Sequence, residues 1–298
     1  IFCLTYFSAL PIKAIGSELN IYSHRQPFLI NPFLKAFTEK TGIKTNVVYS
    51  TKGLAQRLKA EGENSPADVI LTVDIGRLTD LKNAGVTQSI VSETVGRNIP
   101  SNFRDPEGHW FGLTSRARII AASKTRVNTS IVKNYEDLVS KKWKGKICTR
   151  SGKHPYMTAL IASVIAASGE KDAEAWLSGL KNNLARKPQG NDRAQVKAIY
   201  EGQCDLTIIN HYYMAMMLAN PEQKKWAASI NIIFPNQDNR GTHMNVSGAA
   251  IAKFAPNRGN AEKLLEFLVS PEGQRIYGSK NGEYPVSRGV PQSELLAS

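Results

Sequence analysis

The sequence has few of the side chains on which common metal sites and catalytic centres depend. Only three cysteines and five histidines occur in 298 residues. We find no His-Glu-x-x-His pair, no Gly-x-Ser-x-Gly elbow, no phosphate-binding glycine loop and no carboxylates with acid/base spacing. These absences argue against zinc proteases, α/β hydrolases and P-loop enzymes. We therefore expect a protein that is not an enzyme.

Long apolar runs are missing too. Residues 1–14 are apolar but too short to span a bilayer, and we interpret them as the remnant of a secretory signal peptide. A buried first strand is the alternative. No later segment approaches the roughly 18 apolar residues of a membrane helix. The mature chain is therefore expected to be soluble outside the cytoplasm.

Acidic residues are scarce, with 25 Asp and Glu against 38 Lys and Arg, for a net charge of +13. Such a balance fits nucleic acid, an anionic surface or an anionic ligand. The basic residues are scattered or form short sets such as residues 141–144, and no nucleic-acid-reading motif accompanies them. A nucleic-acid partner is therefore not expected.

Cysteine is limited to Cys148 and Cys204 once the leading segment, which holds Cys3, is set aside. Two cysteines in an oxidising compartment most simply form one disulfide. Cys148 lies in a strand-like segment and Cys204 just before another. A bridge would tie two neighbouring strands of one lobe.

The sequence does contain a regular alternation of strand-like and helix-like segments, which predicts an α/β fold with mostly parallel, mixed sheets and flanking helices. The first helix is expected to have Asn31 as its N-cap, Pro32 as its first residue and Gly42 as its end. The strand-like segments are 19–23, 45–49, 68–73, 111–121, 145–149, 206–209 and 245–252. The other helix-like segments include 54–60, 75–84, 155–167, 173–184, 193–200 and 261–269.

Two long extended segments, 111–121 and 245–252, are expected to cross between two lobes and leave a cleft that hinge motion can close. The expected division is a first part of lobe 1 over 15–116, lobe 2 over 117–240, a return to lobe 1 over 241–290 and a tail over 291–298.

Two tyrosines, Tyr212 and Tyr213, follow the apolar run 206–209 at a strand-to-helix turn, where open α/β sheets bind ligands. Taken alone, they favour ordinary half-buried aromatics at a sheet edge. A third, Tyr156, follows Pro155 in the first turn of another predicted helix. If both turns lie at strand ends of one lobe, three phenol oxygens converge in the cleft.

Three phenols favour a hard, highly charged cation. A phenol ordinarily ionises near pH 10, so three phenolates at neutral pH need a strong positive partner. Soft metals prefer Cys or Met, and zinc prefers His and Cys. We therefore predict Fe³⁺, whose three charges three phenolates balance.

An anion is predicted to fill the remaining coordination positions. The loop after the first strand offers Ser23, Arg25 and Gln26, and Arg25 is suited to holding a carbonate-like anion. A surface role for Arg25 is the alternative. His24 is interpreted as a solvated loop residue rather than a ligand, and His154 and His211 as neighbours of the tyrosines.

Several motifs together resemble the periplasmic ferric-iron-binding proteins of bacterial ABC importers. They agree in order and spacing over the whole mature chain, and they are residues 21–30, 67–74, 112–118, 150–156 and 201–213. The resemblance implies a class II periplasmic-binding-protein fold, a monomer in the periplasm and delivery of Fe³⁺ to an inner-membrane ABC permease.

The resemblance also implies roles for individual residues. Tyr156, Tyr212 and Tyr213 match the family's iron-binding tyrosines. Some members carry a His-Tyr pair in the first-lobe loop, where this chain has Gln26 and Pro27. It resembles instead the three-tyrosine subgroup, which uses carbonate or bicarbonate as a synergistic anion; Ser23, Arg25, Gln26 and Arg116 are expected to contact it. The alternative is an anionic organic solute held by Arg25 and Arg116.

Overall fold

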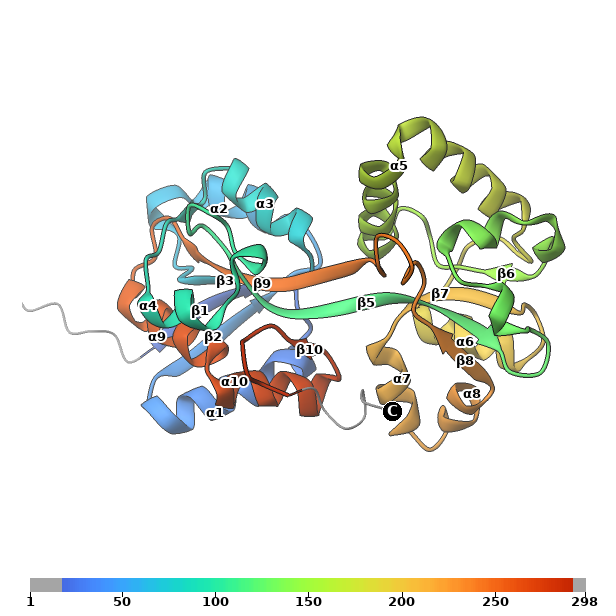
Figure 1. Ribbon diagram of the computed structural model, residues 1–298. Coiled ribbons are helices and arrows are strands. Elements are labelled where there is room, and N and C mark those ends of the chain that lie inside the picture. The colour runs from blue at the N-terminus through green and yellow to red at the C-terminus, as the bar shows by residue number, and fades with distance from the viewer. Residues whose placement is uncertain (1–17, 292–298) are drawn as a thin grey trace, which may run out of the picture.

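Two lobes joined by long strands form the molecule, as the computed structural model of residues 18–291 shows (Figure 1). The predicted two-lobed α/β fold is confirmed. The predicted signal-peptide remnant, residues 1–14, lies outside the described residues, as does the predicted tail beyond residue 291. Within the described part, no helix is both long and apolar enough to cross a membrane.

The helices alternate with strands along most of the chain. The α-helices are α1 Pro27–Thr41, α2 Leu54–Glu61, α3 Ile75–Asn83, α4 Glu93–Asn98, α5 Pro155–Asn182, α6 Asp192–Tyr200, α7 Tyr212–Leu218, α8 Lys224–Ala228, α9 Arg258–Val269 and α10 Pro271–Ile276. The strands are β1 Glu18–Ser23, β2 Lys44–Tyr49, β3 Val69–Thr72, β4 Thr87–Gln88, β5 Phe111–Ser123, β6 Ile147–Cys148, β7 Leu206–Asn210, β8 Ile230–Ile233, β9 Met244–Ala252 and β10 Tyr284–Pro285.

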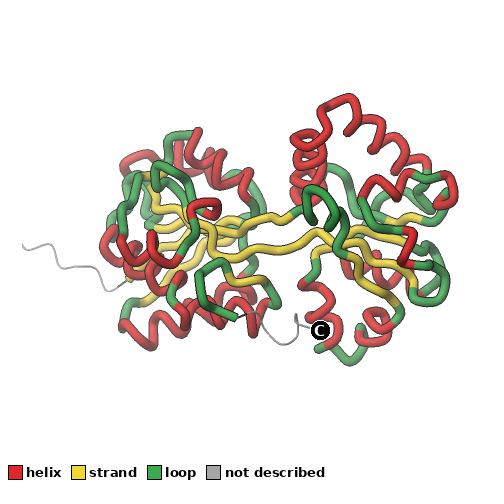
Figure 2. Tube along the Cα trace, in the orientation of Figure 1, coloured by secondary structure: helices red, strands yellow, loops and turns green. Residues whose placement is uncertain are grey.

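Strand β5 belongs to both lobes. Its first half pairs with β9, and its second half, from Arg118 onward, pairs with β7 and β8. The main path of the sheet therefore runs β2-β1-β3-β9-β5-β7-β6 through the whole molecule, and Figure 2 shows the strands passing from one lobe into the other. All thirteen residues of β5 are buried. The predicted crossings at 111–121 and 245–252 correspond to β5 and β9.

The sheet is mixed, as expected, but its pairings are not mostly parallel. Among the described residues only β1–β2, β1–β3 and β6–β7 pair in parallel, and the other pairings are antiparallel. The reason is the double crossing: β9 returns the chain to lobe 1 and must therefore run against both β5 and β3.

Helix α1 begins five residues earlier than the sequence predicts. Its N-cap is Gln26 and its first residue is Pro27, whereas Pro32 lies inside the helix. Either proline suits a first helical position, and Pro32 removes only one backbone hydrogen bond, near the helix start where few bonds are yet formed. The predicted end at Gly42 is confirmed, with a left-handed φ of 74°. This early start places Gln26 at the mouth of the cleft.

The two helices predicted over 155–167 and 173–184 form one span, α5, with a break at Gly169. The φ of 83° and ψ of 166° there are non-helical, and only glycine adopts such a backbone readily. The interruption between the two predicted helices is therefore confirmed.

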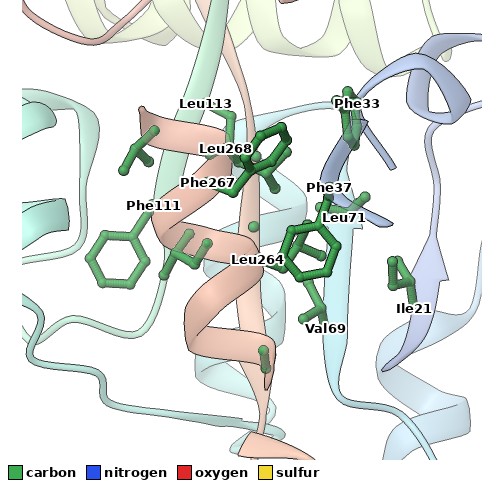
Figure 3. Packing of buried hydrophobic residues seen from close by; sticks show 14 of the residues in the cluster. Ile21, Phe33, Phe37, Val69, Leu71, Phe111, Leu113, Leu264, Phe267 and Leu268 are labelled. Carbon is green, nitrogen blue, oxygen red and sulfur yellow. The ribbon is translucent and has the colours of Figure 1, made fainter. Parts of the chain in front are cut away.

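Each lobe has its own hydrophobic core. In lobe 1, helix α9 packs against helix α1. The rings of Phe37 and Phe267 lie 5.7 Å apart between centroids (Figure 3). In lobe 2, one buried cluster contains Trp143 and Trp176 and a second contains the cysteines. These separate cores allow the lobes to move as units.

The predicted disulfide links Cys148 and Cys204 with their Cα atoms 5.8 Å apart. Cys148 pairs with Thr207 across the parallel β6–β7 ladder, and Cys204 lies just before β7. The bridge therefore fixes the base of the strand that carries Tyr212 and Tyr213 at its other end.

Candidate metal centre

The three tyrosines lie at the carboxyl ends of two neighbouring strands. Because β6 and β7 are parallel, their carboxyl ends meet at the same edge of the sheet. After β6 the chain enters α5, where His154 caps the helix and its Nδ1 accepts the backbone N–H of Tyr156 at 3.2 Å. After β7 it passes directly into α7, which begins at Tyr212. Each tyrosine thus projects from a first helical turn.

The structure brings the three phenols together. The hydroxyl of Tyr212 donates to the hydroxyl of Tyr156 at 3.4 Å, and the rings of Tyr212 and Tyr213 lie 4.4 Å apart between centroids. All three side chains line one cavity of about 420 Å³. Convergence from two separate turns, the condition on which the metal prediction depended, is met.

The cavity lies between the lobes. Its lobe 1 wall comes from the loops after β1, β2 and β3 and from the start of α1, and its lobe 2 wall from the starts of α5, α6 and α7. The lobe 1 residues are His24, Gln26, Phe28, Leu29, Tyr49, Thr51, Val73 and Arg77. The lobe 2 residues are Arg150, His154, Pro155, Tyr156, Asn191, Arg193, Tyr212, Tyr213 and Met216. The cavity wall holds three arginines and no carboxylate.

Burial favours the protonated form of the phenols. It raises the pKa of Tyr213 to about 12 and that of Tyr212 well above 10, and the neighbouring phenol of Tyr156 adds to both shifts. Only a strongly charged cation can offset this cost and draw the phenolate forms into the site.

Three guanidinium groups surround the ring of Tyr156. Their central carbons lie 5.2 Å (Arg116), 5.9 Å (Arg118) and 5.1 Å (Arg150) from the ring centroid. A guanidinium group at such a distance is attracted to the electron-rich face of an aromatic ring. Tyr156 is therefore placed in a cationic environment.

A buried carboxylate, Asp192, holds this environment in place. Its two oxygens accept from Arg118 at 2.5 Å and from Arg150 at 3.0 Å. The same carboxylate accepts the backbone N–H of Asn210 at 3.0 Å, two residues before Tyr212. Burial alone would raise the pKa of Asp192, but the two arginines outweigh it and hold the pKa below its ordinary value of 3.8. Asp192 thus connects the arginines around Tyr156 to the end of β7.

Asp192 was not predicted from the sequence. It is the first residue of α6, far from the tyrosines along the chain, and no motif marks it. The available signal is weak: an Asn-Asp pair that starts a helix, in which Asn191 supplies the N-cap and leaves Asp192 to face inward.

Three members of the predicted anion-binding set, Ser23, Arg25 and Arg116, have intramolecular partners in the structure. Arg25 is 2 % exposed and paired with Glu283, with its Nη2 2.6 Å from Oε2, so it does not line the cavity. Burial alone would lower the pKa of Arg25, but the charge of Glu283 raises it. Ser23 is buried and bonds the backbone of Arg25. Arg116 bonds Ser247 and the carbonyl of Val73. The physical reason is that buried charges and hydroxyls need partners, and here those partners are intramolecular.

Gln26 alone of the predicted set lines the cavity, and other arginines supply the positive charge. Arg193 is half-buried there, and Arg150 shares one carboxylate with Arg118. Arg77 lies 3.5 Å from Asp74 and donates to the carbonyl of Thr51. The wall therefore has an excess of positive charge suited to an anion.

The histidines near the site differ in their ring bonding. Burial lowers the pKa of both His154 and His211 to about 4, so both rings are neutral. His211 stacks on Tyr284 at 4.1 Å, and its Nδ1 accepts the backbone N–H of Ala117. Nδ1 of His24 instead lies 2.7 Å from the carbonyl oxygen of Ser50. The two histidines beside the tyrosines are thus held by backbone groups.

A second kind of metal site, built from His, Cys, Asp or Glu side chains, is not found in the described part of the chain. Within residues 18–291 no group of three or more His, Cys, Asp or Glu side chains is arranged to hold a metal ion. Hard oxygen donors converge at the phenols of the cleft, a donor set suited to a hard trivalent ion.

Comparisons with known proteins give a consistent result. Residues 22–275 match the family described as bacterial extracellular solute-binding protein. Iron uptake protein A1 of Synechocystis sp. is 45 % identical over 284 residues, which cover 94 % of this chain and 79 % of that protein. The major ferric iron-binding protein of Neisseria meningitidis is 28 % identical, covering 92 % and 82 % of the two chains.

Solved structures similar to this chain also include proteins named for ferric-ion binding. Apo ferric ion-binding protein A of Pasteurella haemolytica superposes with a TM-score of 0.91 at 49 % identity, over 95 % of this chain and 89 % of that one. A Trichodesmium protein in complex with iron and citrate gives 0.87 at 46 % identity, over 94 % and 89 %.

Replacing Asp192 by asparagine should destabilise the protein strongly at neutral pH. Two nearly buried guanidiniums then share no carboxylate, a loss of about 3–5 kcal/mol. The pKa of Asp192 is lowered on folding, so its contribution is fully present above about pH 4 and is lost progressively as pH falls through the lowered pKa. Urea unfolding should show a large difference between Asp192→Asn and wild type at pH 7 and a smaller one at pH 3.

The matched control is Glu222→Gln, an exposed carboxylate of the same lobe. It should behave like wild type at both pH values. A difference between Asp192→Asn and wild type that is equal at pH 7 and pH 3 would contradict the stabilising role of the ionised carboxylate.

Proposed function

Since the chain belongs to the bacterial extracellular solute-binding proteins, we propose that it is a periplasmic receptor that captures Fe³⁺ for uptake. The resemblance to ferric-binding proteins is confirmed by relatives named for iron uptake or ferric iron. Those relatives are binding proteins of transport rather than enzymes. The ferric ion is the cargo of the site, bound and released.

The convergence of Tyr156, Tyr212 and Tyr213 is the observation that carries this proposal. Two of the phenol oxygens lie 3.4 Å apart, and the third ring packs against its neighbour. Three phenolates offset the three charges of Fe³⁺, and a less charged ion offsets less of the cost of ionising buried phenols. The arrangement therefore selects the ferric over the ferrous state.

All three proposed ligands belong to lobe 2, which the disulfide and the Asp192 network hold rigid. Iron can then load onto this lobe before the lobes move. The proposed lobe boundaries remain 15–116 and 241–290 for lobe 1 and 117–240 for lobe 2, because the cores on either side of the β5–β9 crossings are separate. Delivery to an inner-membrane ABC permease by the monomeric protein completes the proposed cycle.

A carbonate or bicarbonate ion is proposed to share the iron. The reason is charge: iron with three phenolates is neutral, whereas the cavity wall adds Arg77, Arg150 and Arg193 without a carboxylate. The residues proposed to contact this anion from the cavity wall are Gln26, Arg150 and Arg193. The competing hypothesis is an organic anion held by Arg25 and Arg116. Arg25 is paired with Glu283, and Arg116 bonds Ser247 and the carbonyl of Val73.

Ferric citrate added to chelator-stripped protein should produce a visible phenolate-to-iron charge-transfer band. Tyr156→Phe, Tyr212→Phe and Tyr213→Phe should each weaken iron binding by more than about 100-fold, because losing even an outer partner of a metal ligand costs up to that much. The double variant Tyr212→Phe/Tyr213→Phe should be colourless. Absorbance titration measures both.

Tyr200→Phe is the control, because Tyr200 is 45 % exposed and outside the cavity. It should titrate like wild type. A wild-type protein that stays colourless, or colour that survives the double variant, would contradict ferric-ion binding by these tyrosines. An organic anion would then be the better candidate ligand.

Arg193→Gln should weaken the contribution of bicarbonate to iron retention by about ten-fold, the equivalent of one lost charge-assisted hydrogen bond. The measurement is the rate at which a chelator removes iron, with and without bicarbonate. Arg275→Gln, an exposed arginine on α10, is the control. An equal bicarbonate effect in Arg193→Gln and wild type would remove Arg193 from the anion site.

Iron binding should release protons and strengthen as pH rises. The pKa of Tyr213 is about 12 and that of Tyr212 is higher than its ordinary value, so the phenols are protonated until iron displaces the protons. Release of about three protons raises the binding constant by up to roughly 1000-fold per pH unit. Proton release in weakly buffered solution, and competition with nitrilotriacetate from about pH 5.5 to 7.5, test this. Binding without proton release would exclude phenolate ligation.

A further inference from the structure

The segment that follows α10 packs against α7, the helix that carries two of the tyrosines. The end of this segment, β10, pairs with Ser115 and Thr114 in the first half of β5, which belongs to lobe 1. Gly282 lies two residues before β10. A Cβ atom added at Gly282 would lie 3.2 Å from the Cβ of Ala215 and 3.6 Å from that of Tyr212. Lobe 1 therefore touches α7 directly beside one of the phenols.

Tyr284, the first residue of β10, stacks its ring on the ring of His211. The ring planes are 2° from parallel, and the centroids are 4.1 Å apart. His211 is 3 % exposed and Tyr284 is half-buried, so the stack helps to bury the histidine. Aromatic rings at this separation attract one another beyond the effect of burying their surfaces. The contact between the two lobes is therefore specific in its geometry.

His211 is also fixed to strand β5. Its backbone N–H donates to the carbonyl of Ala117 at 3.0 Å, and its Nδ1 accepts the N–H of the same residue at 3.1 Å. Tyr284 pairs with Ser115, two residues earlier on β5. Both rings of the stack are therefore anchored to one stretch of a strand that is buried throughout.

The ring of His211 connects this stack to the phenols. It meets the ring of Tyr212 edge-on, with 6.0 Å between the centroids and 82° between the planes. Tyr212 in turn donates to the hydroxyl of Tyr156 at 3.4 Å, and its ring lies 4.4 Å from that of Tyr213. A continuous series of ring contacts therefore leads from Tyr284 to the candidate metal centre.

The two helices that carry the tyrosines differ in what holds their first turns. At α5, Pro155 occupies the first turn and the side chain of His154 caps the helix. At α7 the N-cap is His211, whose side chain makes no capping bond, and the helix is only seven residues long. A short helix without a side-chain cap depends on tertiary contacts for its stability. Helix α7 therefore depends more on neighbouring elements than α5 does.

We propose that Tyr284 is a positioning residue for the iron-binding phenols of Tyr212 and Tyr213, acting through the ring of His211. This inference rests on the proposed function. Tyr284 does not line the cavity, so it acts on the phenols and not on the bound ion or its anion. Its ring holds the start of α7 in one direction, and the missing side chain at Gly282 lets the segment approach closely enough to do so.

Loss of the stack should loosen the iron site without unfolding lobe 2. The disulfide and the Asp192 carboxylate still hold the strand that leads into α7. The start of α7 can then tilt, and the phenols of Tyr212 and Tyr213 no longer keep a single distance from that of Tyr156. The expected signs are faster iron release and a changed ligand field at the metal.

Replacing Tyr284 by phenylalanine and by alanine separates the role of the ring from that of the hydroxyl. Tyr284→Phe keeps the stack and should match wild type. Tyr284→Ala should release iron to a chelator about ten-fold faster, as expected for an outer partner of a metal ligand. It should also shift the charge-transfer band and the electron paramagnetic resonance spectrum of the ferric protein. Phe103→Ala, which removes a half-buried ring from the lobe 1 core, is the matched control and should change only the urea midpoint.

A second pair of variants tests the close approach at Gly282. Gly282 and Gly289 both have a left-handed φ, 63° and 73°, so alanine strains the backbone similarly at either position. A Cβ atom at Gly289 meets nothing within 4 Å, whereas one at Gly282 crowds α7. Gly282→Ala should therefore shift the charge-transfer band and speed iron release, and Gly289→Ala should do neither.

The outcomes separate the two proposals. A colourless wild type contradicts ferric-ion binding itself. A coloured wild type whose band and release rate are unchanged in Tyr284→Ala, or changed as much in Tyr284→Phe or Phe103→Ala, overturns the positioning role alone. If Tyr284→Ala does not fold, Tyr284→Leu, which keeps apolar bulk without a stacked ring, takes its place with the same expected result. Equal behaviour of Gly282→Ala and Gly289→Ala would also overturn the positioning role.

Discussion

The buried carboxylate of Asp192 is the interaction on which the arrangement of the three tyrosines depends. It pairs with two arginines, one from β5 and one that follows β6, and it also accepts a backbone N–H at the end of β7. One negative charge thereby fixes the elements that place Tyr156 and Tyr212. A buried carboxylate with these partners is stable, but removal of any partner leaves an uncompensated charge. The geometry of the phenols is therefore tied to the folding of lobe 2.

The distribution of charge explains how one cleft can hold a trivalent cation although its walls are basic. Burial keeps the phenols of Tyr212 and Tyr213 protonated until a strong cation displaces the protons. In the proposed complex three phenolates balance the charge of the metal, and the positive charge of the cavity wall is then available to an anion. Lobe 2 carries the phenols, and residues of lobe 1 line the opposite side of the cavity.

Much of this could be predicted locally. The strand, proline and helix signals around Pro155 placed Tyr156 in a first helical turn, and the apolar run before Asn210 placed Tyr212 and Tyr213 in another. The disulfide between Cys148 and Cys204 could be predicted because only two cysteines remain once the leading segment is set aside. In contrast, Arg25 was expected in the cleft, because a loop arginine after a strand end has no partner that sequence spacing reveals. Its partner, Glu283, lies 258 residues away and meets it only through the return of the chain to lobe 1.

The sequence alone predicted the α/β class and the strand-to-helix turns that carry the three tyrosines, because both depend on short-range patterns of apolar residues, prolines and turns. The resemblance to the family rested on motifs that agree in order and spacing. The tertiary structure alone decided which cations face the cleft, which buried carboxylates pair with the arginines, and how the strands pair. Those properties depend on partners that are distant along the chain. A buried charge or ring takes whichever partner folding brings near, and local spacing carries no record of that choice.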